Sequence, residues 1–476
     1  MLIWNYIVKP LLDMKRRIWV CLLVAGFLWM SGEALSVAAQ GSVRNVIWVI
    51  GDGMGPELMG FFMQGAREGA LKDYTHHTSA LEELLNKGTQ GFFFTNTYNT
   101  PVTDSAAAAT QMATGHYSLP ERIGVDFEGN AHPTFLETAQ QYGKSIGIIS
   151  DAYVTDATPA GFTAHVPSRR QKMQIARQQL DLGIDVILGG GKKYFSTGEN
   201  KELLAQAHKQ GYQVVQDKNA LLSLKGGKIL GLFAEQSLPM AVEMHEHPKV
   251  PQLAQLTQKA LEVLEKNPDG FVLIIEAGKI DWAAHANDAG ATLAELKVLD
   301  KTLSIVLAYA QAHPDTLVYV NADHDTGLGS FSYQVLNPSR AARKSAEGEV
   351  LYDGNTSYGS FNTYALLEKQ RRSLYYVERE LQKLPEQKRT AAIMQKRLRQ
   401  ALGYPVDITE FENIKDVPGI FKQLNEKYGI SWGTPTHSAA PLIGVAYGPY
   451  QELFGGVYHN TDILMKFKTA LGWKEE

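Results

Sequence analysis

The feature that most constrains the fold is a set of short apolar segments that recur along the chain. None of them alternates regularly between apolar and polar residues, which is how strands buried on both faces of a sheet read. Helical stretches at 253–267 and 291–312 lie between them. The pattern predicts an α/β fold with a doubly wound, mostly parallel central sheet flanked by helices. The segments are NVIWVIG (45–51), KSIGIIS (144–150), IDVILGG (184–190), GFVLIIE (270–276), DTLVYVNA (315–322) and PLIGVAYG (441–448).

Residues 330 to about 432 depart from this pattern. The stretch at 351–367 is rich in Tyr, Ser, Asn and Gly, and a basic, helix-like run follows at 369–402. We interpret the region as an insertion packed on the rim of the sheet. A solvated helix face, a lid and a subunit contact all remain open as the role of its basic residues.

The N-terminus has the layout of a secretory leader. The basic triplet at 15–17 precedes an apolar run at 18–30, and small residues follow at 36–41. Thirteen apolar residues suit the core of a signal peptide better than a membrane span. The sequence therefore predicts a signal peptide over 1–39 and a mature domain over 40–476, which would be periplasmic or secreted and without a membrane anchor after cleavage.

Charge and cysteine content exclude several classes of protein. The chain has 46 Lys and Arg against 50 Asp and Glu, a net charge of −4, so it lacks the basic excess typical of nucleic-acid binding. Cys21, within the predicted leader, is the only cysteine. The mature domain therefore has no disulfide, no cysteine nucleophile and no cysteine metal ligand.

The stretch VTDSAAAATQMATG (102–115) predicts a helix that begins abruptly at Ser105. As an N-cap, Ser105 would accept hydrogen bonds from free backbone N–H groups of the first turn. As a nucleophile, it would lie where the helix dipole and the free N–H groups favour an anion such as phosphate. This stretch alone leaves both interpretations open.

Acidic and histidine residues follow several of the predicted strands. In open α/β sheets, ligands bind outside the carboxyl ends of the strands, so these side chains are expected at one edge. Each has a simpler explanation, since Asp52 could belong to a turn and Asp281 with His285 could be an i, i+4 pair. Unrelated turns, however, have no reason to place such residues at so many strand ends. The candidates are Asp52, Asp156, Thr158, Glu276, Asp281, His285, Asp323, His324 and His437.

The ligand types divide into two chemical groups. Aspartate with histidine suits Zn²⁺, whereas an oxygen-only set suits Mg²⁺. A two-metal site clamps the attacking and leaving oxygens of a phosphoryl displacement. A serine oxygen held by a metal needs no histidine base. Together these residues favour metal-dependent phosphoryl transfer with Ser105 as the nucleophile.

Six motifs resemble the alkaline phosphatase family, over roughly 42–330 and 433–472: WVIGDGMG, VTDSAAAAT, TDATPAGFTAHVPSR, IIEAGKIDWAAHAND, NADHDTG and PTHSAAPL. The resemblance implies an exported enzyme that hydrolyses small-molecule phosphate monoesters to an alcohol and inorganic phosphate. It implies that Ser105 is transiently phosphorylated and that Arg169 grips two phosphate oxygens as a fork. A homodimer is one oligomeric state that the resemblance allows, and a monomer is the other.

The resemblance also implies two Zn²⁺ and one Mg²⁺ per chain, with Asp52 bridging two of the ions. The implied ligands are Asp281, His285 and His437 for the first zinc, Asp52, Asp323 and His324 for the second, and Asp52, Thr158 and Glu276, with Asp156 through water, for magnesium.

Two features depart from the family pattern. Trp282 follows Asp281, at a position where well-studied bacterial relatives have a lysine that reaches phosphate through water. Relatives with tryptophan there often have histidine in place of Asp156. Trp282 is therefore expected at the substrate-binding site, while the identity of the third ion stays open. The long segment between His324 and His437 resembles the variable, crown-like insertions of the family.

Other functions have weaker support in the sequence. Sulfatases of the same superfamily use a C/S-x-P-x-R context that DSAAAAT lacks. Phosphodiesterases commonly use threonine and lack the magnesium ligands. A non-catalytic phosphate-binding protein would explain Arg169 but not a full ligand set beside a serine. A phosphodiesterase and a phosphate-binding protein remain the alternatives.

Overall fold

The computed structural model describes most of the chain beyond the predicted signal peptide at 1–39, which lies outside the described residues. The chain divides into two compact units, 1–42 and 43–476, and the described helices and strands lie in the second. No helix in the described part of the chain is long and apolar enough to cross a membrane. The described residues are 42–74, 78–335, 343–344, 350–352, 356–357, 359–406 and 417–474.

A ten-stranded sheet forms the centre of the second unit, in the order β18-β2-β17-β8-β1-β7-β3-β4-β6-β5. Strand β17 is antiparallel to both of its neighbours, and the other pairings in this sheet are parallel. All six predicted strands are present. The strands are β1 (Asn45–Gly51), β2 (Thr89–Phe94), β3 (Ser145–Tyr153), β4 (Val186–Gly190), β5 (Gln213–Val215), β6 (Ile229–Leu232), β7 (Phe271–Ala277), β8 (Thr316–Asn321), β17 (Leu442–Tyr447) and β18 (Gly456–His459).

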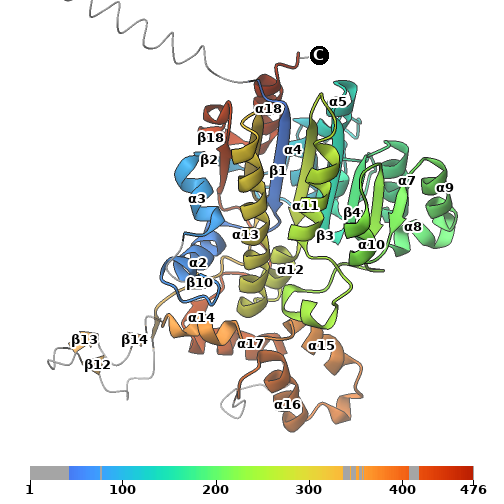
Figure 1. Ribbon diagram of the computed structural model, residues 1–476. Coiled ribbons are helices and arrows are strands. Elements are labelled where there is room, and N and C mark those ends of the chain that lie inside the picture. Colours follow the sequence, from blue (N-terminus) through green and yellow to red (C-terminus); the bar gives the residue numbers. More distant parts are fainter. Residues whose placement is uncertain are drawn as a thin grey trace, which may run out of the picture. The chain divides into compact units, whose positions relative to one another are not determined.

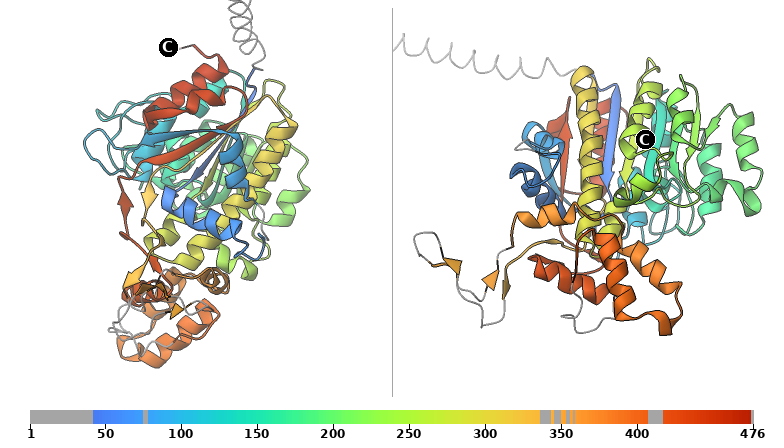
Figure 2. Two further views of the ribbon diagram at one scale, coloured as in Figure 1. Left: turned by 90° about the vertical axis from the view of Figure 1, so that its left-hand side faces the viewer. Right: turned by 60° about the horizontal axis from the view of Figure 1, so that its bottom comes forward.

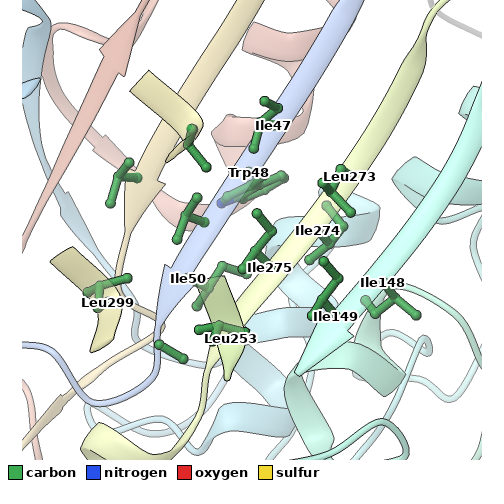
Figure 3. Packing of buried hydrophobic residues seen from close by; sticks show 14 of the residues in the cluster. Ile47, Trp48, Ile50, Ile148, Ile149, Leu253, Leu273, Ile274, Ile275 and Leu299 are labelled. Atoms are coloured by element: carbon green, nitrogen blue, oxygen red, sulfur yellow. The ribbon is translucent and has the colours of Figure 1, made fainter. Parts of the chain in front are cut away.

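The central strands are buried on both faces, which explains their unbroken apolar sequences. Every residue of β1 and β7 is buried. Trp48 of β1 lies edge-on to Phe162 at 5.1 Å between ring centroids and packs against Phe467 at 4.8 Å. Its indole N–H donates to Asn321 Oδ1 at 2.6 Å. Figure 3 shows Trp48 among the isoleucines and leucines of β1, β7 and β3.

Helices cover both faces of the sheet. One face carries α11 (Leu253–Leu264) and α13 (Ala289–Ala312), and the other carries α4 (Ser105–Thr114), α5 (Phe135–Gln141) and α18 (Ile463–Leu471) (Figure 1). The doubly wound, mostly parallel architecture is confirmed. The other helices before the insertion are α2 (Pro56–Arg67), α3 (Ala80–Lys87), α6 (Ala157–Gly161), α7 (Lys172–Asp181), α8 (Lys193–Ser196), α9 (Leu203–Lys209), α10 (Lys218–Ser223), α12 (Lys279–His285) and the 3₁₀ helices η2 (Gly198–Asn200) and η3 (Ala241–Glu246).

Among the described residues between β8 and β17, four α-helices lie beyond the carboxyl ends of the central strands (Figures 1 and 2). They are α14 (Asn362–Leu367), α15 (Leu374–Gln382), α16 (Ala391–Leu402) and α17 (Val417–Lys427). Helices α15 to α17 share a small apolar core of their own. Asp288, at the start of α13, ties this region to the sheet because its carboxylate accepts from Gln370 Nε2 and from Leu374 N, both at 2.7 Å.

Short strand pairs flank these helices. β9 (Asp325–Thr326) pairs with β16 (His437–Ser438), β10 (Ser330–Phe331) with β15 (Ile430–Ser431), β11 (Gln334–Val335) with β14 (Thr356–Ser357), and β12 (Arg343–Lys344) with β13 (Val350–Tyr352). The remaining 3₁₀ helices are η4 (Glu386–Lys388), η5 (Gln451–Phe454) and η6 (Asn460–Asp462). The pairing of β9 with β16 brings His437 to the strand-end region that contains His324.

Candidate active site

Ser105 is the first residue of α4, and it is not the N-cap. Asp104 takes that position, with an extended backbone and a carboxylate that accepts from Ala107 N at 3.0 Å. The N-cap interpretation of Ser105 is therefore wrong, because the neighbouring aspartate already caps the helix. Ser105 is 3% exposed, and its Oγ lies 3.1 Å from His324 Nε2.

The alanines of α4 follow from close packing. All ten residues of the helix are buried, and α6 approaches so closely that a Cβ added at Gly161 would lie 2.7 Å from the Cβ of Ala109. Only small side chains fit between the two helices at this distance. The close contact fixes the position of α4 and with it the position of Ser105.

His285 and His437 face each other through their Nε2 atoms, 3.1 Å apart. The Nδ1 of His285 lies 2.8 Å from the carbonyl of Pro435, and that of His437 lies 2.9 Å from the carbonyl of Thr103. Carbonyl oxygens only accept, so each Nδ1 carries a proton and each Nε2 faces the site as a potential metal ligand. Asp281 Oδ1 lies 3.3 Å from one Nε2 and 3.6 Å from the other. Three electron-pair donors thus converge on one point.

A second group of donors surrounds His324. Its Nε2 lies 3.5 Å from Asp52 Oδ1 and 3.3 Å from Asp323 Oδ2. The hydroxyl of Thr326 donates to Asp281 Oδ1 at 2.6 Å and accepts from His324 Nδ1 at 3.2 Å, which leaves the Nε2 lone pair free to face the site. Ligand atoms of Asp281 and Asp52 lie within 4.8 Å of His324, so Asp281 is within reach of both groups.

The turn after β1 places Asp52 in this group. Gly53 has φ +73, a conformation that favours glycine, and its N–H donates to Asp323 Oδ1 at 3.1 Å. A Cβ at Gly53 would lie 2.8 Å from Thr326 Oγ1. The turn interpretation and the ligand interpretation of this sequence are therefore compatible, because the turn delivers the carboxylate to the site.

The buried carboxylates carry more negative charge than the protein groups around them balance. Burial, with the charges of Asp323 and Asp281, raises the pKa of Asp52 well above its usual value. Burial, with the charge of Asp281, raises the pKa of Asp323 to about 6. Asp52 Oδ1 and Asp323 Oδ2 are buried and have no hydrogen-bond partner among the described residues. Such groups are costly to bury, and divalent cations would offset that cost. The residues therefore fit metal ions.

The oxygen-only set lies on the neighbouring strand ends. Glu276, at the end of β7, is buried, and burial with the charge of Asp156 raises its pKa well above the usual value. Ser150 Oγ donates to its carboxylate. Thr158 Oγ1, on α6, is buried beside the Glu276 carboxylate. These oxygens, with those of Asp52, suit a hard cation.

Arg169 lies between two carboxylates beside Ser105. Its Nη1 donates to Asp104 Oδ2 at 3.1 Å, and its Nη2 lies 3.6 Å from Asp156 Oδ1. The backbone N–H of Arg169 donates to Glu121 O at 2.7 Å. The guanidinium is therefore held next to the residue that caps α4, where an anion bound at the helix N-terminus would meet it.

Lys172 is a charged residue of this region that the sequence analysis did not single out. It is the first residue of α7, and its Nζ donates to Asp156 Oδ1 at 2.7 Å. Although burial raises the pKa of Asp156, the charges of Lys172 and Arg169 hold it below its ordinary value. A lysine does neighbour Asp156, but it comes from α7 and not from the position of Trp282. The polar stretch that contains it carries no pattern that indicates this contact.

Trp282 lies at the edge of the site. It is half-buried on α12, and its ring centroid lies 5.8 Å from that of Tyr153. In the described part of the chain, no hydrogen bond or ring contact joins Trp282 to Ser105 or Arg169. The structure thus brings the other candidate residues together and places Trp282 beside them.

A serine at a helix N-terminus, an adjacent arginine and converging Asp and His donors, all at one edge of a doubly wound sheet, define a metal-dependent phosphoryl hydrolase. A family model described as alkaline phosphatase matches residues 43–473. The chain belongs to the alkaline phosphatase family and is a phosphomonoesterase hydrolase.

Characterised relatives agree with this assignment. Alkaline phosphatase 3 of Bacillus subtilis is 30% identical over 446 residues, which cover 91% of this chain and 90% of the relative. Alkaline phosphatase of Escherichia coli is 35% identical over 67% of this chain and 77% of its own length. Among solved structures, Thermus thermophilus alkaline phosphatase is 27% identical with a TM-score of 0.78, covering 92% of this chain and 94% of the other. A cold-active alkaline phosphatase from Shewanella sp. is 30% identical with a TM-score of 0.72, covering 90% and 99%.

Proposed function

We propose that this phosphomonoesterase works through a phosphoserine at Ser105. Ser105 Oγ attacks phosphorus, an Oγ–P bond forms, and the ester P–O bond breaks so that the alcohol leaves with a proton. Water then cleaves the Oγ–P bond and releases inorganic phosphate. The observation that carries the proposal is Ser105 Oγ at the start of α4, 3.1 Å from His324 Nε2 and beside the converging Asp and His donors.

The chain's own groups bind and orient the phosphate. The first backbone N–H groups of α4 have no partner within the helix, and they favour an anion at its N-terminus. Arg169 supplies two parallel N–H donors, which match two phosphate oxygens. Asp104 and Asp156 hold the guanidinium in place from either side.

The donor chemistry supports two zinc ions and one magnesium ion. When bound, such ions polarise phosphoryl oxygens and lower the pKa of coordinated water and of the serine hydroxyl. Their proposed ligands are Asp281, His285 and His437 for one zinc, Asp52, Asp323 and His324 for the other, and Asp52, Thr158 and Glu276, with Asp156 through water, for magnesium.

The leader pattern at 1–39 supports export, and we propose a periplasmic or secreted location for the enzyme. Fractionation of cells that express the full chain tests this proposal. A processed form in the periplasm or medium is the expected result. An unprocessed form confined to the cytoplasm would contradict it.

The Ser105→Ala variant tests the mechanism, with phosphate release from an aryl phosphate monoester and the matching diester as the assay. We expect the wild type to prefer the monoester and the variant to lose roughly a thousandfold or more of its turnover. The variant should retain bound metal and phosphate, because its backbone N–H groups and Arg169 are unchanged. Retained turnover in the variant would exclude Ser105 as the nucleophile, and faster hydrolysis of the diester would indicate a phosphodiesterase.

A further inference from the structure

A cavity of about 450 Å³ lies between the sheet and helix α15, next to the candidate active site. Tyr153 and Trp282 line it from the sheet side, and Tyr375, Tyr376 and Arg379 line it from α15. Figure 1 shows α15 below the strand ends, across from α12. A volume of this order fits one small organic group.

The wall of the cavity neighbours the proposed phosphate site, because Tyr153 in that wall lies beside Lys172. Lys172 Nζ lies 5.1 Å from the centre of the Tyr153 ring and 2.7 Å from Asp156 Oδ1, and Asp156 in turn faces Arg169. Trp282 directly follows Asp281, one of the proposed metal ligands. A substrate whose phosphate contacts Arg169 would therefore direct its remaining part toward these rings.

The walls are suited to a planar ring. Tyr375 is 59% exposed, so its ring is available to a ligand. Tyr376 has the Arg372 guanidinium 4.4 Å from its ring centre, a contact that positions the ring. The rings of Tyr153 and Trp282 meet at 50° and do not stack flat on each other. Aromatic walls of this kind favour planar ligands through stacking.

The charges of the cavity do not oppose a substrate that carries a phosphate. Glu243 accepts hydrogen bonds from the N–H and the hydroxyl of Ser373, and Glu380 is paired with Lys383. Within the described residues, Arg379 forms no ion pair and no side-chain hydrogen bond, and it is exposed at the rim of the cavity. One cation thus remains available to a polar edge of the ligand.

We propose that this cavity is the leaving-group subsite of the enzyme and that it accepts a planar aromatic group, such as the base of a nucleoside monophosphate. The proposal rests on the proposed function, because it places the substrate phosphate at Ser105 and Arg169. It assigns to α15, within the insertion, a direct part in substrate selection.

Adenosine 5′-monophosphate and ribose 5-phosphate form a matched pair of substrates, because both release a primary alcohol and they differ in the base. We expect kcat/KM to be roughly fivefold or more higher for the nucleotide, the size of effect that one base–aromatic stack provides. Tyr375→Ala should reduce this ratio toward one, whereas Tyr375→Phe should preserve it, because stacking needs the ring and not the hydroxyl. Tyr142→Ala removes a tyrosine that is 45% exposed and stacks on Trp473 outside the cavity, so it should leave the ratio unchanged.

The outcomes separate this proposal from the proposed function. A ratio near one in the wild type, with efficient turnover of ribose 5-phosphate, would overturn the subsite and leave the phosphatase mechanism intact. Failure to hydrolyse either compound would overturn the mechanism. In that case, calorimetric titration of Ser105→Ala with the two compounds still tests the subsite, since equal affinities would exclude it and tighter binding of the nucleotide would support it.

Discussion

At the scale of single residues, the outer hydrogen bond of each histidine decides which of its ring nitrogens faces the site. The Nδ1 atoms of His285 and His437 donate to backbone carbonyls, so their Nε2 atoms face each other across the site. Burial lowers the pKa of His324 well below the usual value, and the Thr326 hydroxyl accepts from its Nδ1, so its Nε2 also faces the site. Outer hydrogen bonds of this kind fix the tautomer of a metal-binding histidine.

Lys172 offers a test at the same scale. Its removal would leave the negative charge of Asp156 without its closest partner, next to Arg169 and the incoming phosphate. We expect Lys172→Ala to raise the inhibition constant of inorganic phosphate about tenfold, the effect of one nearby charge at an intermediate dielectric. Lys172→Arg should recover most of the loss, because it restores the charge.

Lys193→Ala provides the control for this measurement. Lys193 also lies over the Tyr153 ring, at 5.7 Å, but no ion pair joins it to Asp156 within the described residues. Its removal should change the inhibition constant by no more than about twofold, because solvent and salt screen the more distant charge. Equal effects of the two alanine variants would show that Lys172 has no special part in phosphate binding.

At the scale of elements, helix caps and their neighbours fix the segment that carries Arg169. Helix α5 begins with a capping box, in which Thr134 Oγ1 accepts from Glu137 N and Glu137 Oε2 accepts from Thr134 N. Glu137 also accepts from His165 Nε2 at 2.9 Å, while His165 Nδ1 donates to Gly124 O at 2.7 Å. Both ring nitrogens face acceptors, an arrangement that favours the imidazolium form of His165. It lies four residues before Arg169.

This pair predicts a pH dependence of stability. The hydrogen bond to Glu137 raises the pKa of His165, so its contribution is complete below about 6.5 and is lost as pH rises through the higher folded-state value. Although burial raises the pKa of Glu137, its hydrogen bond with His165 lowers it overall. The contribution of Glu137 is present above about 4.3 and is lost as pH falls below that value. The pair is therefore strongest between these two pH values.

We expect His165→Gln to lower the Tm by about 2 °C near pH 5.5 and by less near pH 9, where the wild-type pair has weakened. Thermal unfolding of both proteins across this pH range, at one metal concentration, is the measurement. His208→Gln, on the exposed face of α9, should give a small difference that does not change with pH. A constant difference for His165→Gln would mean that its charge does not stabilise the fold.

At the scale of the whole domain, the site is assembled at the carboxyl ends of the central strands. Strands β1, β7 and β8 end at one edge and deliver Asp52, Glu276 and Asp323 to it. The chain then passes through the insertion and returns in β16, which brings His437 beside β9. The proposed ligands therefore come from segments far apart in sequence, and bound ions would join these segments.

Metal removal tests this view of the domain. Chelation should lower the Tm by at least about 5 °C, because ions at a thousandfold excess over Kd contribute about 4 kcal/mol and their loss leaves the buried carboxylates unbalanced. Zn²⁺ with Mg²⁺ should restore both the Tm and the turnover of an aryl phosphate. Metal analysis should give two zinc ions per chain. Fewer than two, together with a Tm that chelation does not change, would exclude the proposed metal centre.

The sequence was sufficient to predict the central strands and the chemical type of the site. Strands β1 and β7 are recognisable because burial on both faces requires unbroken apolar runs. The sequence was insufficient to predict the shorter or half-exposed strands. In β2, buried and exposed residues alternate over TQGFFF, and β5 has only three residues. These strands owe their conformation to pairing with partners that are remote in sequence.

Local periodicity and residue type were enough to predict the fold class and to propose the donor residues at the strand ends, because they record which faces are buried and which atoms can bind a cation. The packing of the folded chain was needed to show that Lys172 neutralises Asp156 and that Trp282 lines a cavity with α15. Both contacts join segments that are separate in the sequence and meet only in the folded chain. Their relative placement is a property of the packed chain, and no local pattern encodes it.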